Sequence, residues 1–416
     1  MKADNMIEKN GTICENLVTP VSDHAEVVVA GGGIAGIAAA LAAARNGADV
    51  LLIEAEYALG GLATLGLITM YLPLCDGCGH QVSFGIAEEL LRLSVKHGHE
   101  GVYPAAWLEG GSDEEKIKTR FRADYNGPLF CIEAERLLLE AGVRILYGTR
   151  VCRAVTDGDR ITALVVENKS GRYALTVKSV IDATGDADIA ERAGAETVRF
   201  GGGNLLAAWY YFIKQPGDKN KLKVLGPSDV PEDEKAKGKK VKEVLSDKRF
   251  SGLDGNELSE MVIMSHEQIY RNFTEKRSEY PEYVPTSIAT IPQIRMTRRI
   301  AGRATLHKTD DKKEFPDSVG LISSWRRRGP IYEIPFGALC SDNIINLYAA
   351  GRDISADDPM WDLTRVIPAC AVTGEAAGTA AAMASEYDCR SDMIDIALLR
   401  KRLSVQGVKL GIKEIL

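Results

Sequence analysis

The 416-residue sequence has few aromatic residues, few cysteines and no long hydrophobic run. Its longest apolar stretch, residues 33–44, is too short to span a bilayer, which needs about 20 apolar residues. Residues 1–24 are polar and lack the apolar core of a signal peptide. We therefore expect a cytoplasmic protein that does not contact a membrane.

The sequence has fewer basic than acidic residues. The chain has 51 Lys and Arg residues against 58 Asp and Glu residues, which gives a formal net charge of −7. Because nucleic acids bind basic surfaces, this balance argues against a nucleic acid partner. Lysines do gather between Lys235 and Lys248, but acidic residues alternate with them, which indicates a solvated surface.

The cysteine count excludes two further classes. Eight cysteines in 416 residues are far fewer than a small secreted, disulfide-rich protein contains. The closely spaced cysteines that hold iron–sulfur clusters are also missing. We therefore expect no iron–sulfur cluster in this chain, and we assign no metal ligands.

The clearest motif that is present covers residues 27–54, where a strand, a glycine turn, a helix and a second strand lead to an acidic residue. Gly31 permits the tight turn, Gly33 lets the backbone approach a pyrophosphate, and Gly36 lets helix and strand pack closely. The first amides of the helix then face the phosphates. Glu54 follows Gly31 at nearly the expected spacing of about 20 residues and can accept hydrogen bonds from the ribose hydroxyls. This motif predicts a dinucleotide site.

The rest of the chain suggests two structural units. Residues 151–176 read as three antiparallel strands, and a fourth strand is predicted over residues 177–183. Between about residue 200 and residue 329 the pattern changes to longer strands and a charged helix, residues 256–276, as expected for an inserted domain. We predict an N-terminal tail (1–24), a first dinucleotide-binding part (25–200), a substrate or cap domain (201–330), a second dinucleotide-binding part (331–390) and a C-terminal helical tail (391–416).

Five segments together resemble one known group of proteins, the FAD-dependent oxidoreductases with a glutathione-reductase-like fold. The sequence is similar to the broad FAD-dependent oxidoreductase family that is distantly related to fumarate reductase and to the flavin subunit of heterodisulfide reductases. The resemblance implies an α/β protein with an FAD-binding Rossmann domain, an inserted α+β cap domain and non-covalently bound FAD. The segments are residues 31–36 with Glu54, 60–64, 177–188, 295–299 and 346–384.

The resemblance also implies which residues contact FAD. Val151 would meet the adenine, Gly185 and Asp186 would pass under the pyrophosphate, and Asp353 would reach the ribityl chain. The helix that begins near Pro368 would point its first amides at the flavin, where the helix dipole favours the negative charge of the reduced ring. The residues predicted to bind the cofactor are Gly31, Gly33, Ile34, Ala35, Gly36, Glu54, Ala55, Gly60, Gly61, Leu62, Ala63, Thr64, Val151, Ala183, Thr184, Gly185, Asp186, Gly351, Arg352, Asp353, Arg365, Val366, Ala369 and Val372.

One loop carries candidate catalytic residues. Cys75 and Cys78 could form a redox-active pair or hold a metal ion, but we favour a glycine-rich turn with incidental thiols. His80 could act as a general acid or base, or could tether flavin covalently. A hydrogen-bonded loop histidine is the interpretation we favour for it.

Arginines and aromatic residues are the other candidates. A guanidinium group binds a carboxylate through two parallel hydrogen bonds, so Arg299 and Arg365 could hold an acidic substrate. Surface ion pairs are the alternative. The aromatic residues could stack on flavin, although packing between domains is the interpretation we favour; they are Trp325, Tyr332, Phe336 and Trp361.

The function we expect is hydride transfer between flavin and a small organic substrate, for which a carboxylate-bearing molecule is one option. Gly201-Gly202-Gly203 lacks the strand and acid of a second dinucleotide motif, so we predict no separate nicotinamide domain. One alternative is an electron-transfer subunit that partners an iron–sulfur protein, and another is a dithiol reductase that uses Cys75 and Cys78. A redox partner protein and a homo-oligomer are both compatible with the sequence.

Overall fold

The structure is a computed structural model that describes residue 13, residues 15–226 and residues 244–416. Most of the predicted N-terminal tail therefore lies outside the described residues. The same holds for the lysine cluster up to residue 243.

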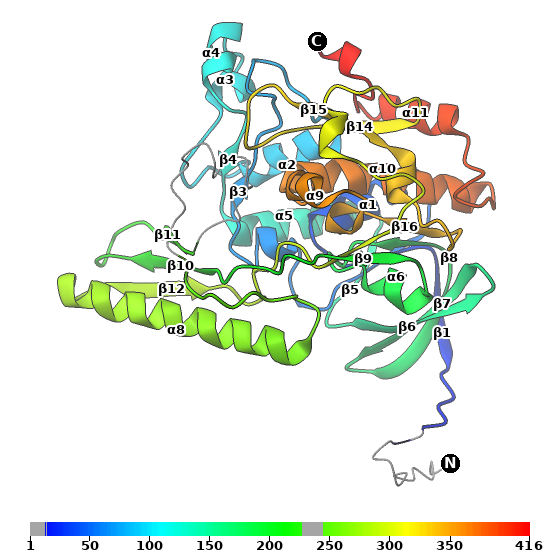
Figure 1. Cartoon of the computed structure of the whole chain (residues 1–416), viewed down its shortest axis with the longest axis horizontal. Helices are drawn as coiled ribbons and strands as arrows, with labels where there is room; N and C mark the ends of the chain where they lie inside the picture. Colours follow the sequence, from blue (N-terminus) through cyan, green and yellow to red (C-terminus); the bar gives the residue numbers. More distant parts are fainter. Residues whose placement is uncertain (1–12, 14, 227–243) are drawn as a thin grey trace.

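A seven-stranded sheet forms the centre of the molecule (Figure 1). Five of its strands run parallel, in the order β5-β2-β1-β8-β16. The residues of β2 and the last four of β1 are buried and apolar, as expected where helices cover both faces of a parallel sheet. The five strands are β5 (Arg144–Leu146), β2 (Val50–Ile53), β1 (Val21–Ala30), β8 (Gly171–Asp182) and β16 (Leu347–Ala349).

The strand β8 corrects one prediction. The expected third and fourth strands, divided near residue 176, are one continuous strand of 12 residues. Its first half pairs antiparallel with β7 (Arg160–Asn168), which pairs with β6 (Arg150–Asp157), and its last residues pair parallel with β16. The chain changes its partner along one edge without a turn, so the sequence carries no signal for the change.

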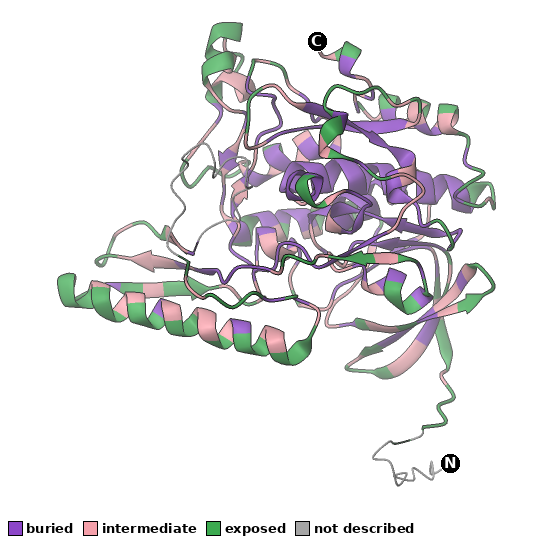
Figure 2. Ribbon diagram, viewed as in Figure 1, coloured by how far each residue is buried: buried purple, intermediate pink, exposed green. Residues whose placement is uncertain are grey.

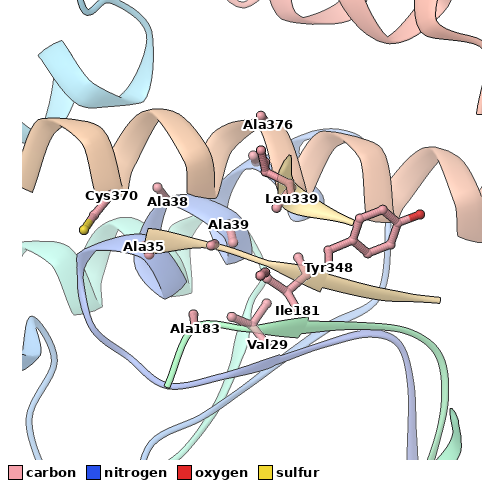
Figure 3. Packing of buried hydrophobic residues seen from close by; sticks show 14 of the residues in the cluster. Val29, Ala35, Ala38, Ala39, Ile181, Ala183, Leu339, Tyr348, Cys370 and Ala376 are labelled. Atoms are coloured by element: carbon pink, nitrogen blue, oxygen red, sulfur yellow. The ribbon is translucent and has the colours of Figure 1, made fainter. Parts of the chain in front are cut away.

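Two helices of small residues pack side by side over the parallel strands (Figure 3). They are α1 (Ile34–Arg45) and α10 (Ile367–Glu386). A Cβ atom at Gly374 would lie 2.2 Å from the carbonyl oxygen of Ala35, and one at Gly378 would lie 2.1 Å from that of Ala39. Because no side chain separates the two backbones here, the helices cross in very close contact. Figure 2 shows that both are almost wholly buried.

A small separate sheet and one long helix form the cap, which projects from one side of the molecule (Figure 1). The helix α8 begins after Asp254, whose carboxylate accepts a hydrogen bond from the Glu257 amide. This helix confirms the charged helix predicted over residues 256–276. The elements of the cap are β10 (Ala208–Ile213), β11 (Lys221–Leu225), α8 (Gly255–Glu279) and β12 (Val284–Ile288).

The predicted end of the cap at residue 330 is too late. The cap sheet ends at residue 288, and β14 (Ser318–Ser323) instead pairs with β15 (Ile331–Pro335). This hairpin packs on α10 and on α11 (Ile396–Val405). Hairpin strands look alike in either domain, so only the tertiary contacts assign them.

The other elements surround this frame. The segment 99–127 contains the two short helices α3 and α4 and the short strand β4. The remaining elements are β3 (Met70–Tyr71), α2 (Ile86–Ser94), α3 (Ala105–Leu108), α4 (Asp113–Lys118), β4 (Ala123–Asp124), α5 (Gly127–Glu140), α6 (Asp188–Ala193), β9 (Thr197–Arg199), β13 (Arg298–Ile300) and α9 (Asp358–Thr364), with five short 3-10 helices.

Within the described ranges, no single helix is long and apolar enough to cross a membrane. The helices α9 and α10 reach the required length and composition only as a pair, and they meet at an angle of 88°.

A buried carboxylate joins α10 to α2. Glu375 is only 2% exposed, and its Oε2 accepts a hydrogen bond of 2.8 Å from the Ile86 amide at the start of α2. Burial raises the pKa of Glu375 to about 8, and the negative charge of Glu89 adds to the effect, while the Ile86 amide and Arg45 oppose it. The folded protein therefore favours the protonated side chain near neutral pH.

This shift predicts a pH-dependent stability. The folded-state pKa of Glu375 lies above the ordinary value of about 4.3. The stability that the protonated side chain contributes is therefore complete below about pH 4.3 and is lost as the pH rises toward about 8. Between those limits, each rise of one pH unit lowers the free energy of unfolding by up to about 1.4 kcal/mol. We expect Glu375→Gln, which keeps an acceptor for Ile86, to flatten this part of the slope.

Denaturant unfolding across this pH range provides the measurement. The control is Glu386→Gln, which changes an exposed glutamate at the end of the same helix and should keep the wild-type slope. A wild-type slope in Glu375→Gln would show that Glu375 does not titrate in this range.

Candidate functional site

A cavity of about 790 Å³ opens at the carboxyl ends of the parallel strands. Ala30, Ile53, Ala183 and Ala350 follow or end β1, β2, β8 and β16, and all four line the cavity. Open α/β sheets bind ligands at this edge. The lining residues are Ala30, Gly31, Gly33, Ile34, Ala35, Ile53, Glu54, Ala55, Glu56, Gly60, Gly61, Leu62, Ala63, Ile68, Met70, Leu72, Thr149, Arg150, Val151, Ala183, Thr184, Gly185, Asp186, Asp188, Ile189, Arg192, Trp209, Val224, Gly226, Gly252, Leu258, Ile291, Pro292, Ile294, Arg295, Trp325, Ala350, Gly351, Arg352, Arg365, Val366, Ile367 and Cys370.

The three glycines of the first turn differ in what surrounds them. Gly31 has a φ of +102°, and a Cβ there would lie 2.4 Å from the carbonyl oxygen of Ala183. A Cβ at Gly36 would lie 1.8 Å from the carbonyl oxygen of Gly31. At Gly33, by contrast, a Cβ would have no atom of the described chain within 4 Å, and this residue lines the cavity. Gly31 and Gly36 therefore serve the fold, and Gly33 leaves room for a ligand.

The start of α1 offers a site for an anion. Gly33 is the residue before the helix and provides no side chain to cap it. Ile34 and Ala35, whose amides have no partner within the helix, line the cavity. Such amides, together with the helix dipole, bind phosphate groups.

Glu54 lines the cavity at the end of β2. Its Oε2 accepts a hydrogen bond of 2.6 Å from the Gly32 amide, and its Oε1 accepts one of 2.8 Å from the Glu56 amide. Burial raises the pKa of Glu54, and these two amides partly offset the effect. Each carboxylate oxygen retains a second acceptor site for a ribose hydroxyl.

Asp353 occupies a different place from the one predicted. It does not line the cavity, and its two oxygens accept hydrogen bonds from the amides of Gly185 (3.0 Å) and Ala187 (3.1 Å). Burial raises the pKa of Asp353 well above its ordinary value, and the nearby Asp182 and Asp186 add to the effect. Asp353 therefore supports the Gly185 turn from below, a role that its place after Gly-Arg in the sequence did not suggest.

Four other residues predicted to bind the cofactor also lie outside the lining. Gly36 packs against Gly31, and the Thr64 hydroxyl donates a hydrogen bond to the Leu59 carbonyl. Ala369 and Val372 are buried in α10. They shape the walls from behind, and the other nineteen predicted cofactor residues line the cavity.

Arg365 lies at the cavity wall, at the end of α9. Its NH2 nitrogen donates a hydrogen bond of 2.6 Å to Asp362, which also accepts hydrogen bonds of 2.5 Å and 3.0 Å from Arg326. Burial acts to raise the pKa of Asp362, but the charges of Arg365 and Arg326 bring it below the ordinary value. One carboxylate is thus shared by two guanidinium groups. In addition, the buried Nε of Arg365 has no hydrogen-bond partner among the described residues.

Arg299 does not line the cavity. Its Nε donates a hydrogen bond to the Ala356 carbonyl, its NH2 nitrogen lies 3.3 Å from Asp358, and its guanidinium packs on the Trp361 ring at 4.9 Å. Burial lowers the pKa of Arg299, although Asp358 opposes the effect. These contacts tie β13 to α9, and they hold the Arg299 guanidinium away from the cavity lining.

The loop with the thiols is also separate from the cavity lining. Cys75 is buried, and its sulfur accepts a hydrogen bond of 3.2 Å from the Phe121 amide, whereas Cys78 is exposed. Asp76 organises the loop by accepting hydrogen bonds from the amides of Cys78 and His80 and by pairing with the His80 ring at 2.9 Å. This is the hydrogen-bonded loop histidine that we favoured. The described residues include no group of three or more metal-binding side chains.

Only one of the four candidate aromatic residues reaches the cavity. Trp325 lines it, whereas Tyr332, Phe336 and Trp361 are buried. The Trp361 indole donates a hydrogen bond of 2.8 Å to the Arg352 carbonyl. Packing is thus the role of the three buried rings, as favoured from the sequence.

Several lining residues were not predicted from the sequence. Trp209 and Val224 come from the cap sheet, Arg295 follows it, and Cys370 lies on the first turn of α10. Asp188 and Arg192 belong to α6. The cap residues carry no recognisable spacing, but Cys370 lay within a segment already assigned to the cofactor and could have been found there.

The contrast between the glycines predicts a specific outcome for Gly33→Ala. Because its Cβ meets no protein atom, the apo protein should keep its thermal stability, while the methyl group should obstruct the pyrophosphate and weaken FAD binding at least about tenfold. FAD titration followed by flavin fluorescence measures the affinity.

A matched control is Gly201→Ala, where a Cβ also meets no atom within 4 Å and where the residue does not line the cavity. It should bind FAD as the wild type does. Equal FAD affinity for Gly33→Ala and the wild type would mean that the pyrophosphate does not pass this turn.

The chain is similar to several solved structures at low sequence identity. The chain is 13% identical to p-nitrophenol 4-monooxygenase PnpA from Pseudomonas putida DLL-E4, with 93% of this chain and 89% of that chain covered and a TM-score of 0.49. It is 16% identical to the 3-ketosteroid-delta4-(5alpha)-dehydrogenase from Rhodococcus jostii RHA1, with 88% and 100% covered and a TM-score of 0.40.

Among curated proteins, a thioredoxin reductase of Ureaplasma parvum serovar 3 is 29% identical over 97 residues. The match covers 23% of this chain and spans only 28% of that protein. It is too short to assign the activity of that protein to this one.

The family comparison covers far more of the chain. The model of the FAD dependent oxidoreductases matches residues 26–203 and 214–403, which include the glycine turn, the cavity walls and most of the cap. The strand ends, the open space at Gly33 and the uncapped start of α1 fit an FAD molecule. The chain belongs to the FAD dependent oxidoreductase family: it is an oxidoreductase with a Rossmann-type fold, and its cofactor is FAD.

Proposed function

We propose that this enzyme transfers a hydride between FAD and a small organic substrate that carries a carboxylate. When bound, FAD accepts or supplies the hydride. The observation that carries the proposal is the position of Arg365, a guanidinium group at the cavity wall that shares its only described carboxylate partner with Arg326.

The shared carboxylate at this wall favours an anionic ligand at Arg365. Arg365 donates one hydrogen bond to Asp362, and the same carboxylate accepts two hydrogen bonds from Arg326. The cluster is largely buried, where a charge interacts more strongly than in water. A substrate carboxylate would complete it, because a guanidinium group has five N–H donors and Arg365 uses few of them.

The position of Arg365 relative to α10 is also suitable for holding a substrate next to the flavin. Arg365 is two residues before the first residue of α10, and Val366 and Ile367 line the cavity beside it. By the family resemblance, the first amides of this helix would face the flavin. A carboxylate on Arg365 would then hold the substrate next to the reactive part of the cofactor, and the hydrogen bonds would fix its orientation.

The remaining features belong to the same proposal. The substrate is a small molecule, and the enzyme works in the cytoplasm. Nucleic acid and membrane are not partners; the negative net charge supports the exclusion of nucleic acid.

An electron-transfer subunit with an iron–sulfur partner is the competing function. Rapid reduction of the flavin by a metabolite, without any second protein, would favour the proposal over this alternative.

Arg365→Gln tests the proposal directly. Loss of the charge should weaken the binding of a carboxylate substrate by about 10- to 100-fold, because a charge-assisted hydrogen bond contributes about 1.5–3 kcal/mol. The uncharged amide of the same substrate should bind equally well to both proteins. Binding is measured by the change in flavin absorbance.

Arg327→Gln is the control. Arg327 is an exposed neighbour that does not line the cavity, so its variant should bind the carboxylate like the wild type. Unchanged carboxylate affinity in Arg365→Gln, with full FAD content, would contradict the proposal.

The dithiol alternative has its own test. Since neither thiol lines the cavity, Cys75→Ser and Cys78→Ser should each leave the rate of flavin reduction within about twofold of the wild type, the effect of a change outside the site. The rate is measured with dithiothreitol and with any active metabolite. Loss of reduction in Cys78→Ser, in a protein that still holds FAD, would instead support a dithiol reductase.

A further inference from the structure

We propose that the substrate is a carboxylic acid with a mainly apolar body, such as an aromatic ring or a hydrocarbon chain, which lies against the cap. This inference rests on the proposed function, because it assigns the carboxylate to Arg365. It adds the chemistry of the rest of the molecule, which the cap side of the cavity determines.

The cap side of the cavity is apolar. Apart from glycines, the lining residues that come from residues 209–295 of the described chain are all apolar except Arg295. The segment below the cap adds Met70 and Leu72. The polar groups on this wall are the Arg295 guanidinium and the indole N–H of Trp209, whose nitrogen has no hydrogen-bond partner among the described residues. A body with many polar groups, such as a sugar, would lose more hydration against this wall than these donors could replace.

The register of the cap sheet explains why these side chains face the cavity. Trp209 on β10 pairs directly with Val224 on β11, so both side chains lie on the same face of the sheet. The opposite face carries Tyr210, which packs against Ile269 of α8. Because α8 covers one face, the face with Trp209 and Val224 is the one turned toward the FAD-binding part.

Two contacts hold this face over the cavity. The hydroxyl of Tyr211, two residues after Trp209 and therefore on the same face, lies 2.5 Å from the Thr69 hydroxyl, next to Met70. The segment after β12 contacts the loop before Thr69, since Gln293 donates a hydrogen bond of 2.6 Å to the Gly66 carbonyl. Ile291 and Pro292 line the cavity from this segment.

The charged wall also has an apolar neighbour. The Trp325 indole donates a hydrogen bond of 3.1 Å to the carbonyl of Asp362, the residue that pairs with Arg365. Trp325 and Arg365 both line the cavity. A ligand bound at Arg365 therefore has an aromatic ring close to its carboxylate, and the cap contributes further apolar side chains to the lining of the same cavity.

Three probes separate the contributions of charge and apolar body. The FAD-loaded enzyme is titrated with phenylacetate, acetate and phenylacetamide, and binding is followed by flavin absorbance and by calorimetry. We expect phenylacetate to bind at least about tenfold more tightly than acetate, because the ring buries apolar surface. It should also bind at least about tenfold more tightly than phenylacetamide, because only the acid pairs with Arg365.

Two variants test the wall itself. Trp209→Ala should reduce the preference for phenylacetate over acetate at least about fivefold, while Trp209→Phe, which keeps an aromatic ring, should stay within about twofold of the wild type. Unchanged acetate affinity and FAD content show that each variant is folded.

The possible outcomes separate this inference from the proposed function. If acetate, or butanedioate as a further probe, binds as tightly as phenylacetate, the inference of an apolar substrate body is wrong. The proposal that Arg365 binds a carboxylate is not affected by that result. If phenylacetamide binds as tightly as phenylacetate, or if no probe binds, the proposed function fails and this inference fails with it. A complete loss of binding in Trp209→Phe would show that the indole N–H, and not apolar contact, holds the ligand, which would also overturn the inference.

Discussion

The close crossing of α1 and α10 is the contact on which the rest of the structure depends. The carbonyl oxygens of Ala35 and Ala39 approach Gly374 and Gly378 so closely that any side chain at the two glycines would collide with the backbone. The helices come from opposite ends of the chain (Figure 1). Their contact brings the turn after β1 and the segment before α10 to one place.

The cavity follows from this crossing. Its walls come from the ends of strands that are distant in sequence, and the crossing places Gly351 against Ala35, where a Cβ would lie 2.8 Å from the alanine methyl. Buried acids then fix the loops around it. Asp353 holds the amides of Gly185 and Ala187, and Asp182 accepts hydrogen bonds from the amides of Ile189 and Ala190 at the start of α6. The amides of these loops are thereby satisfied inside the protein.

The cap contributes a different kind of surface. The FAD-binding part surrounds its ligand with backbone amides and carboxylates, whereas the cap presents the apolar face of a small sheet. Arg365 lies between these two environments, at the junction of α9 and α10. The proposed substrate would then lie between the flavin and the apolar side chains of the cap.

The sequence alone predicted the cofactor, and most of the predicted cofactor residues line the cavity. The glycine turn, Glu54 and the later Gly185 and Gly351 motifs are local features, because a tight turn or a close backbone approach requires particular residues at fixed spacings. The same holds for the helices α1, α8 and α10. Arg365 was also found from the sequence, by its place before a helix expected to face the flavin.

Only the tertiary structure decided which candidates share a site. Arg299 and Asp353 lie close in sequence to residues that line the cavity, but their side chains bind other groups. Arg299 donates a hydrogen bond to the Ala356 carbonyl, and Asp353 accepts one from the Gly185 amide. Trp209 and Val224 gave no signal, because their meeting depends on strand pairing and on which face α8 covers. The change of partner along β8 and the packing of β14 on α10 could not be predicted from the sequence for the same reason. Strands with similar sequences differ in their partners because long-range packing, and not local residue preference, selects the pairing.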